Sequence, residues 1–163
     1  MNILIRSSSF LFPDSDIWKN IHKNAKFVFA EYSDFHSNKY YKKKVDNEIL
    51  VIFLRDIIEN SDETSYQNIK NKKINKLIPL IENKLKKNKD INFIICISNY
   101  ENSNLVNYAK FENNSNKIKK FFLQKIYNLS KNYPNLYIVD MDAIFSEEGY
   151  KNCFDNRNYY SFR

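Results

Sequence analysis

The chain has 163 residues, 43% of them hydrophobic and 28% charged, values typical of one folded protein with a single core. Its one glycine, Gly149, excludes the glycine-rich loops that commonly hold ATP, GTP or NAD, because a Cβ would collide with the phosphates there. Two cysteines are too few for a disulfide framework or for a zinc site with four cysteine ligands, and two histidines are too few for a His-rich metal centre, so no cofactor and no metal are predicted.

Five short apolar segments, rich in branched and aromatic residues, predict β-strands along the chain. None of them alternates strictly between apolar and polar residues, which is typical of strands buried on both faces of a parallel sheet. The segments are Asn2–Ile5, Lys26–Ala30, Ile49–Leu54, Ile91–Ile97 and Leu136–Val139.

Helical patterns fill the intervals between these strands. A short helix around Trp18 is predicted to begin at a cap formed by Asp14 or Asp16. Two longer helices are indicated by apolar residues spaced three and four apart, and Pro79 predicts a kink or a restart in the first of them. Their apolar stripes are Ile74, Ile78, Ile81 and Leu85, and then Ile118, Phe122, Ile126 and Leu129.

A last helix is predicted from about Asp142 to Glu148, with Asp142 as its N-cap and Gly149 as its C-terminal cap. Strand and helix thus alternate five times, which predicts an α/β three-layer sandwich with a five-stranded parallel sheet. We expect one domain over residues 1–163. Sites in such folds lie at the carboxyl ends of the strands. The residues that follow the predicted strands are therefore candidates: Ser7–Ser9, Glu31–Asp34, Arg55–Asp56, Ser98–Asn99 and Asp140–Asp142.

The net charge of +7 raises the question of a nucleic-acid partner. Most of it is local, because residues 70–90 carry eight lysines against Glu82 and Asp90. Only four of the 26 basic residues are arginines, the side chain that base recognition favours, and AT-rich coding explains a high lysine content. We therefore interpret the segment as a solvated basic helix face and keep nucleic-acid binding as a minor alternative. No apolar run approaches the roughly 18 residues of a membrane span, and MNILIRSSSF lacks a secretory signal pattern, so we expect a cytoplasmic protein with no membrane partner.

Three places could carry chemistry. Ser7, Ser8 and Ser9 follow the first strand, where a serine can present its hydroxyl beside helix N-terminal amides, or can merely cap a turn. The Asp140–Met–Asp142 sequence has the pattern of the phosphoryl-accepting motif of haloacid-dehalogenase-type phosphatases, but that motif begins its own domain, and only 21 residues follow it here. Near the end, Asp155 and Arg157 stand among aromatic residues, either as a surface ion pair or as a functional pair at the sheet edge.

The remaining reactive side chains have structural interpretations. Cys96 lies within an apolar strand and is interpreted as a buried small hydrophobe. His22 and His36 are interpreted as surface or packing residues.

A family resemblance comes from the segment LYIVDMDAIFSEEGYKNCFDNRNYYSFR, Leu136–Arg163. A strand and an Asp lead there through a short helix ending in Gly to an aromatic-Asp-x-Arg-aromatic stretch, as at the end of the N-terminal region of FkbH-like proteins. NILIRSSSF, YSDF, VIFLRDI and ICISNYE follow the same order as the other strand ends of that region. The resemblance implies a flavodoxin-like sheet of the SGNH-hydrolase type, beside a haloacid-dehalogenase domain that helps load glyceryl or similar units onto a carrier protein.

Carried over to this sequence, the SGNH pattern is incomplete. Ser9 takes the nucleophile position, and Asp155 the acidic position of the final block. The glycine of the second block is absent, and Arg55–Asp56 stands where the third block would have its glycine and its oxyanion-hole asparagine. Asn158 stands where the general base would be a histidine, and an amide cannot take up a proton near neutral pH.

We therefore hold two main hypotheses. In the first, the chain is a degenerate SGNH-like module that positions an acyl, glyceryl or sugar-linked group in a natural-product or surface-glycan pathway, with a haloacid-dehalogenase-type or carrier-protein partner. In the second, it is a weak serine esterase or acyltransferase. The second would use Ser9 as nucleophile and Asp155 as its assistant. In either case the predicted substrate contacts are Ser8, Arg55, Asp56, Asn99, Arg157 and Asn158.

Overall fold

The computed structural model of the chain describes residues 1–8, 23–31, 34, 37, 39–42, 44–54, 73–98 and 114–148. Its elements in chain order are β1 (Asn2–Ser7), β2 (Lys26–Phe29), the 3-10 helix η1 (Lys39–Lys42), β3 (Asn47–Phe53), α4 (Asn75–Lys87), β4 (Asn92–Ser98), α5 (Asn114–Ser130), β5 (Leu136–Asp140) and α6 (Met141–Glu148). The predicted helix around Trp18 and the predicted cap Gly149 lie outside the described residues.

The five strands form one parallel sheet in the order β2-β1-β3-β4-β5, the flavodoxin-like order. All five predicted strands are present, each within two residues of its predicted ends. Because every strand points the same way, all carboxyl ends meet at one edge of the sheet, and this edge gathers Ser7, Ser98 and Asp140. The α/β fold with a five-stranded parallel sheet is confirmed.

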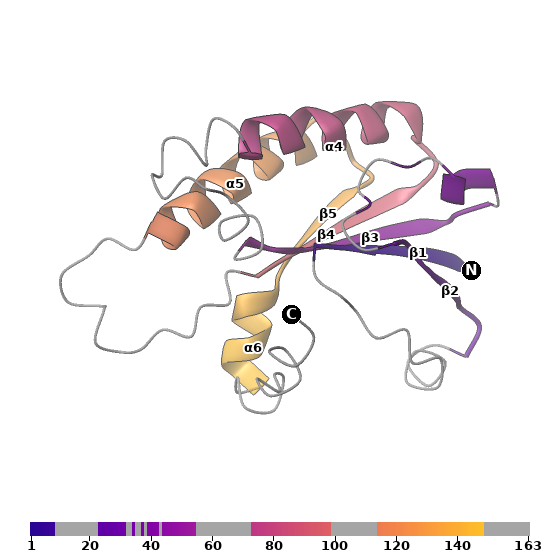
Figure 1. The fold of residues 1–163 in the computed structure, drawn as a ribbon, viewed down its shortest axis with the longest axis horizontal. Coiled ribbons are helices and arrows are strands. Elements are labelled where there is room, and N and C mark those ends of the chain that lie inside the picture. Colours follow the sequence, from indigo (N-terminus) through magenta and orange to yellow (C-terminus); the bar gives the residue numbers. More distant parts are fainter. Residues whose placement is uncertain are drawn as a thin grey trace.

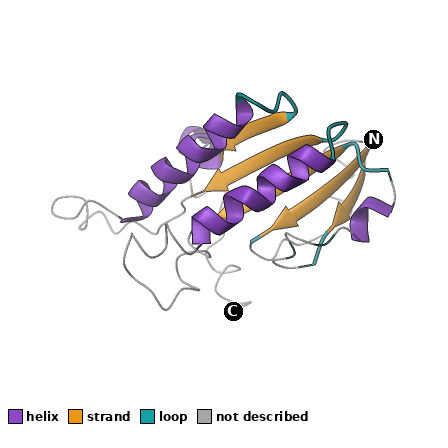
Figure 2. Ribbon diagram, turned by 90° about the horizontal axis from the view of Figure 1, so that it is seen from above, coloured by secondary structure: helices purple, strands orange, loops and turns teal. Residues whose placement is uncertain are grey.

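Helices cover the sheet on both faces and make three layers. α4 and α5 lie side by side over one face, and α6 lies on the other (Figures 1 and 2). The face under α4 and α5 holds the larger apolar core, in which the stripe residues Ile81, Leu85, Ile118 and Phe122 pack against the strands. A smaller core on the α6 face includes Ile5, Phe53 and Met141. The central strands are thus buried on both sides, as their uninterrupted apolar runs predict.

The predicted restart at Pro79 is wrong, because α4 runs through this residue without a break. A wider, π-type turn at residues 73–74 precedes the helix. Pro79 lies in the second turn on an exposed side, where its ring removes one donor to the carbonyl of Asn75. The strong apolar stripe below it stabilises the helix despite this loss. None of the described helices is long and apolar enough to cross a membrane.

Candidate functional site

Of the residues predicted as catalytic or as substrate contacts, Ser8 is the one that the structure describes, and it is bound to the neighbouring strand. Its backbone N–H donates to the carbonyl of Val51 at 3.0 Å, and its hydroxyl oxygen accepts the N–H of Phe53 at 2.8 Å. The side chain is buried, with the whole residue 4% exposed. Ser8 therefore joins the end of β1 to the end of β3, and its hydroxyl group has a structural role there.

The other predicted catalytic and substrate-contact residues lie outside the described part of the chain. These are Ser9, Arg55, Asp56, Asn99, Asp155, Arg157 and Asn158. His22 and His36, interpreted as surface or packing residues, also lie outside it.

A polar cluster lies at the carboxyl edge, where β4 and β5 end and α6 begins. The ammonium group of Lys119, from α5, lies 2.7 Å from a carboxylate oxygen of Asp140 and 2.7 Å from one of Asp142. The hydroxyl of Ser98, a fully buried residue, donates to Asp142 at 2.6 Å. We call Ser98, Lys119, Asp140 and Asp142 the edge cluster.

The edge cluster also corrects the prediction for the start of α6. The helix begins at Met141, so its N-cap is Asp140 rather than Asp142. The Oδ1 atom of Asp140 accepts the N–H of Asp142 at 3.1 Å, as an N-cap side chain does. Asp142 lies in the first turn, where a carboxylate also interacts favourably with the helix dipole.

Lys119 is the internal cation of the edge cluster. Burial lowers its pKa, but the hydrogen bonds that it donates to Asp140 and Asp142, with their negative charges, outweigh burial and raise the pKa above its usual 10.5. Lys119 therefore stays charged at neutral pH and cannot act as a general base. One side of Asp140 stays open, because its side chain is 40% exposed and both of its hydrogen bonds are made by Oδ1. The cluster thus presents a rigid carboxylate, suited to accept a hydrogen bond from a hydroxyl group.

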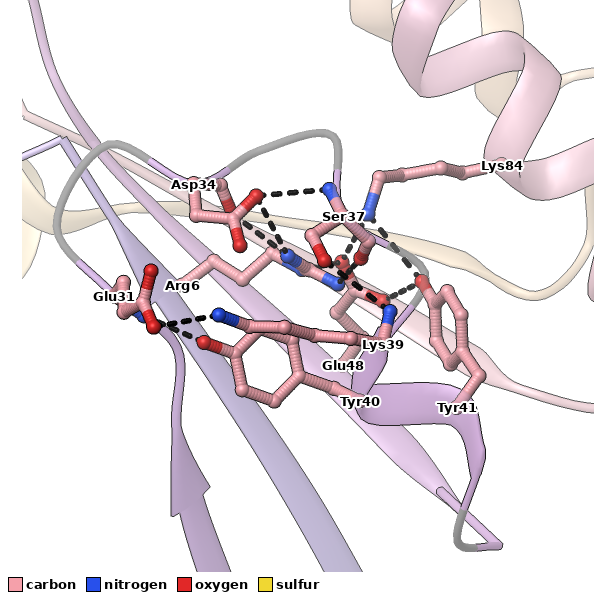
Figure 3. A network of polar contacts seen from close by, with 9 residues as sticks. All are labelled: Arg6, Glu31, Asp34, Ser37, Lys39, Tyr40, Tyr41, Glu48 and Lys84. Atoms are coloured by element: carbon pink, nitrogen blue, oxygen red, sulfur yellow. Dashed lines mark hydrogen bonds and ion pairs between the residues drawn. The ribbon is translucent and has the colours of Figure 1, made fainter.

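A second polar network is buried on the α4 side of the sheet (Figure 3). Arg6 of β1 is 1% exposed, and its Nε donates to Glu48 of β3 at 2.8 Å. Its two terminal nitrogens donate to the carbonyls of Asp34 and Ser37, each at 2.7 Å. Arg6 thereby holds the chain between β2 and β3 against the sheet, and we call it and its partners the arginine clamp.

Glu48 receives further donors in the arginine clamp. The ammonium of Lys84, from α4, lies 3.0 Å from Glu48 Oε1, and the hydroxyl of Tyr41 donates to the other carboxylate oxygen. Burial, followed by the Glu48 charge, raises the pKa of Tyr41, which therefore donates as a neutral phenol. Lys84 was predicted to belong to a solvated basic face; here its side chain is 13% exposed, so this part of the prediction is wrong.

Two charged residues in the sequence indicate the arginine clamp, although the prediction of the strands did not consider them. Arg6 directly follows the apolar residues of β1, and Glu48 directly precedes those of β3. A charged residue within each of two neighbouring buried strands is costly unless the two charges pair. Lys119, by contrast, is one of several lysines on α5, and nothing in its spacing distinguishes it.

Cys96 is partly buried against the smaller core, and burial raises its pKa. A thiol with a raised pKa is a poor nucleophile, in keeping with its prediction as a small apolar residue. Among the described residues, no group of three or more His, Cys, Asp or Glu side chains is arranged to hold a metal ion.

Comparison with known proteins shows the fold but no sequence family. No protein-family model and no curated protein matches the sequence. The fold is similar to that of the N-terminal part of BF1531 from Bacteroides fragilis, a crystal structure described as containing a phosphatase domain complexed with Mg. The TM-score is 0.74 at 15% sequence identity, and the match covers 99% of this chain. It covers 46% of the other chain, so this chain spans less than half the length of a protein that carries a phosphatase domain.

Proposed function

We propose that this chain is a degenerate SGNH-hydrolase-like module of the FkbH-like type. It binds or positions an acyl, glyceryl or sugar-linked group at the carboxyl edge of its sheet and acts beside a haloacid-dehalogenase-type partner. The observation that carries the proposal is the fold likeness over 99% of the chain to part of a protein with a phosphatase domain. The family resemblance of the sequence leads to the same kind of domain.

The chemistry of the described carboxyl edge supports positioning rather than hydrolysis. The hydroxyl of Ser8 is used to join two strands, and Lys119 is held charged between two carboxylates. A serine nucleophile needs a neighbouring group that accepts its proton near neutral pH. In the edge cluster, Lys119 instead forms ion pairs with Asp140 and Asp142, an arrangement that suits a rigid binding surface.

Asp140 is the residue of the edge cluster that we expect to touch the bound group. Its partly exposed carboxylate can accept a hydrogen bond from a hydroxyl such as those of a glyceryl or sugar unit. Asn at this position would keep the helix cap but lose the charge, since Asn and Asp cap helices about equally well. Asp140→Asn therefore tests binding without removing the start of α6.

The test uses the N-acetylcysteamine thioester of glyceric acid as the probe, followed by NMR chemical-shift mapping on the full chain. We expect saturable shifts at Ser98, Asp140 and Met141, with no consumption of the thioester. Asp140→Asn should weaken the apparent affinity about tenfold, the loss of one charged hydrogen bond. The matched control is Asp90→Asn, an exposed carboxylate at the opposite end of β4, which should bind the probe as the wild type does.

A fluorophosphonate labelling assay distinguishes the positioning role from the alternative, a serine esterase or acyltransferase. Labelling that disappears in Ser9→Ala, together with thioester turnover, would make the chain a serine esterase or acyltransferase and overturn the positioning role. The absence of any saturable shift at the carboxyl edge would overturn the proposed binding site itself.

A further inference from the structure

The charged residues of the described elements are segregated between the two faces of the sheet. α4, α5 and the residues that flank them, 73–90 and 114–131, carry eleven lysines against Glu82 and Asp90. α6, on the opposite face, carries Asp142, Glu147 and Glu148 and no basic residue. AT-rich coding explains how many lysines the chain has, but it does not explain why they gather on one face.

Eight of these lysines are exposed: Lys73, Lys76, Lys86, Lys87, Lys89, Lys120, Lys125 and Lys131. Lys86 is paired with Glu82 on the same helix at 2.8 Å. The other seven have no carboxylate partner within the described residues. α4 and α5 lie side by side over the same face of the sheet (Figure 2), and we call the exposed lysines of these two helices and their flanking residues the lysine face.

The lysine face has an aromatic centre on α5. Lys120 and Tyr127 are seven residues apart on one side of α5, and Lys131 directly follows the end of the helix. Tyr127 is 59% exposed, and the ammonium of Lys131 lies 4.9 Å from the centre of its ring. An exposed tyrosine surrounded by charges is typical of the centre of a protein interface, where it supplies contact area at low cost in side-chain entropy.

We propose that the lysine face is a docking surface for an acidic protein surface, rich in Asp and Glu. The two helices form a broad layer on the sheet, so neither projects singly as a helix that enters a DNA groove does. The cations are lysines rather than arginines, and arginine is the side chain of choice for nucleic-acid recognition. The acidic α6 on the opposite face would repel the same partner, so the charge segregation also sets its orientation.

The test compares two charge reversals of equal size. Lys120→Glu/Lys131→Glu alters the lysine face, and Lys23→Glu/Lys26→Glu alters two exposed lysines before and at the start of β2. The two substitutions in each variant lower the net charge by four, from +7 to +3. The probes are a 20-residue helical peptide with glutamates along one side, the same peptide with glutamines, and a 20-base-pair DNA duplex.

We expect the glutamate peptide to bind and to shift NMR signals of α4 and α5, whereas the glutamine peptide does not bind. Lys120→Glu/Lys131→Glu should weaken this binding at least tenfold, while the β2 reversal leaves it within about twofold. Equal weakening by both reversals would show attraction by net charge alone and overturn the proposal. Tighter binding of the DNA duplex, with a steep fall in affinity as salt is raised, would assign the face to nucleic acid instead.

This inference is independent of the proposed small-molecule site. The lysine face lies over one side of the sheet, whereas the edge cluster lies at the strand ends. NMR shifts separate the two results, because the thioester probe should perturb residues 98, 119 and 140–142, whereas the peptide should perturb α4 and the part of α5 around Tyr127.

Discussion

At the scale of single residues, the most deeply buried ion pair among the described residues is that of Arg6 and Glu48. Removing one member leaves the other charged and desolvated, a change that costs about 3–5 kcal/mol in buried pairs. We therefore expect Arg6→Met to lower the free energy of unfolding by about 3 kcal/mol or more in urea titrations. The control pair, Lys39 with Glu31, has a similar distance of 2.6 Å but is 45% and 76% exposed, so Lys39→Met should cost far less than Arg6→Met.

The double variant Arg6→Met/Glu48→Gln distinguishes pairing from simple loss of packing. If the two side chains stabilise each other, the double change costs less than the sum of the single changes. Additive costs would show that the arginine clamp acts through packing alone, and equal costs for Arg6→Met and Lys39→Met would show that burial does not strengthen the pair.

At the scale of elements, Lys119 joins α5 to the start of α6 through two carboxylates. Its pKa is raised in the folded chain, so its contribution to stability is complete below the unfolded value of 10.5 and is lost as the pH rises through the folded value. The difference in unfolding free energy between wild type and Lys119→Met should therefore be constant from pH 7 to 9 and shrink above pH 10.5. Tyr41 also titrates in the basic range but is present in both proteins, so its effect cancels.

The control for this measurement is Lys120→Met, an exposed neighbour on the same helix with no carboxylate partner among the described residues. The difference in unfolding free energy between Lys120→Met and the wild type should stay small over the same pH range. A difference for Lys119→Met that persists unchanged to pH 12 would show that the link between α5 and α6 is not ionic.

Elements differ in how far the sequence determines them. Apolar runs predict the five strands because burial on both faces leaves little choice of residue, and the stripe of α5 predicts the buried Ile118, Phe122 and Ile126. The continuation of α4 through Pro79 depends instead on packing by residues distant in sequence, which local propensity does not contain. The contact of Lys119 with Asp140 and Asp142 also depends on residues distant in sequence, because the order of the strands brings the members of the edge cluster together.

At the scale of the whole molecule, stability should be greatest in the middle of the sheet. β1, β3 and β4 each have two neighbouring strands and bury Ile5, Ile52 and Ile95 almost completely. β2 is a four-residue edge strand with one neighbour and no fully buried side chain. The proposed binding site lies where the central strand β4 and the edge strand β5 end, so one side of it is supported by a strand with two neighbours.

Hydrogen exchange measured by mass spectrometry tests this order. Amides of β1, β3 and β4 should exchange only through global unfolding, whereas those of β2 should exchange faster through local opening. Because Arg6 holds the carbonyls of Asp34 and Ser37, Arg6→Met should speed exchange in and around η1 more than in β4. If β2 exchanged as slowly as β3, or if Arg6→Met sped all strands equally, the sheet would open as one unit. The arginine clamp would then stabilise the whole fold rather than the connection between β2 and β3.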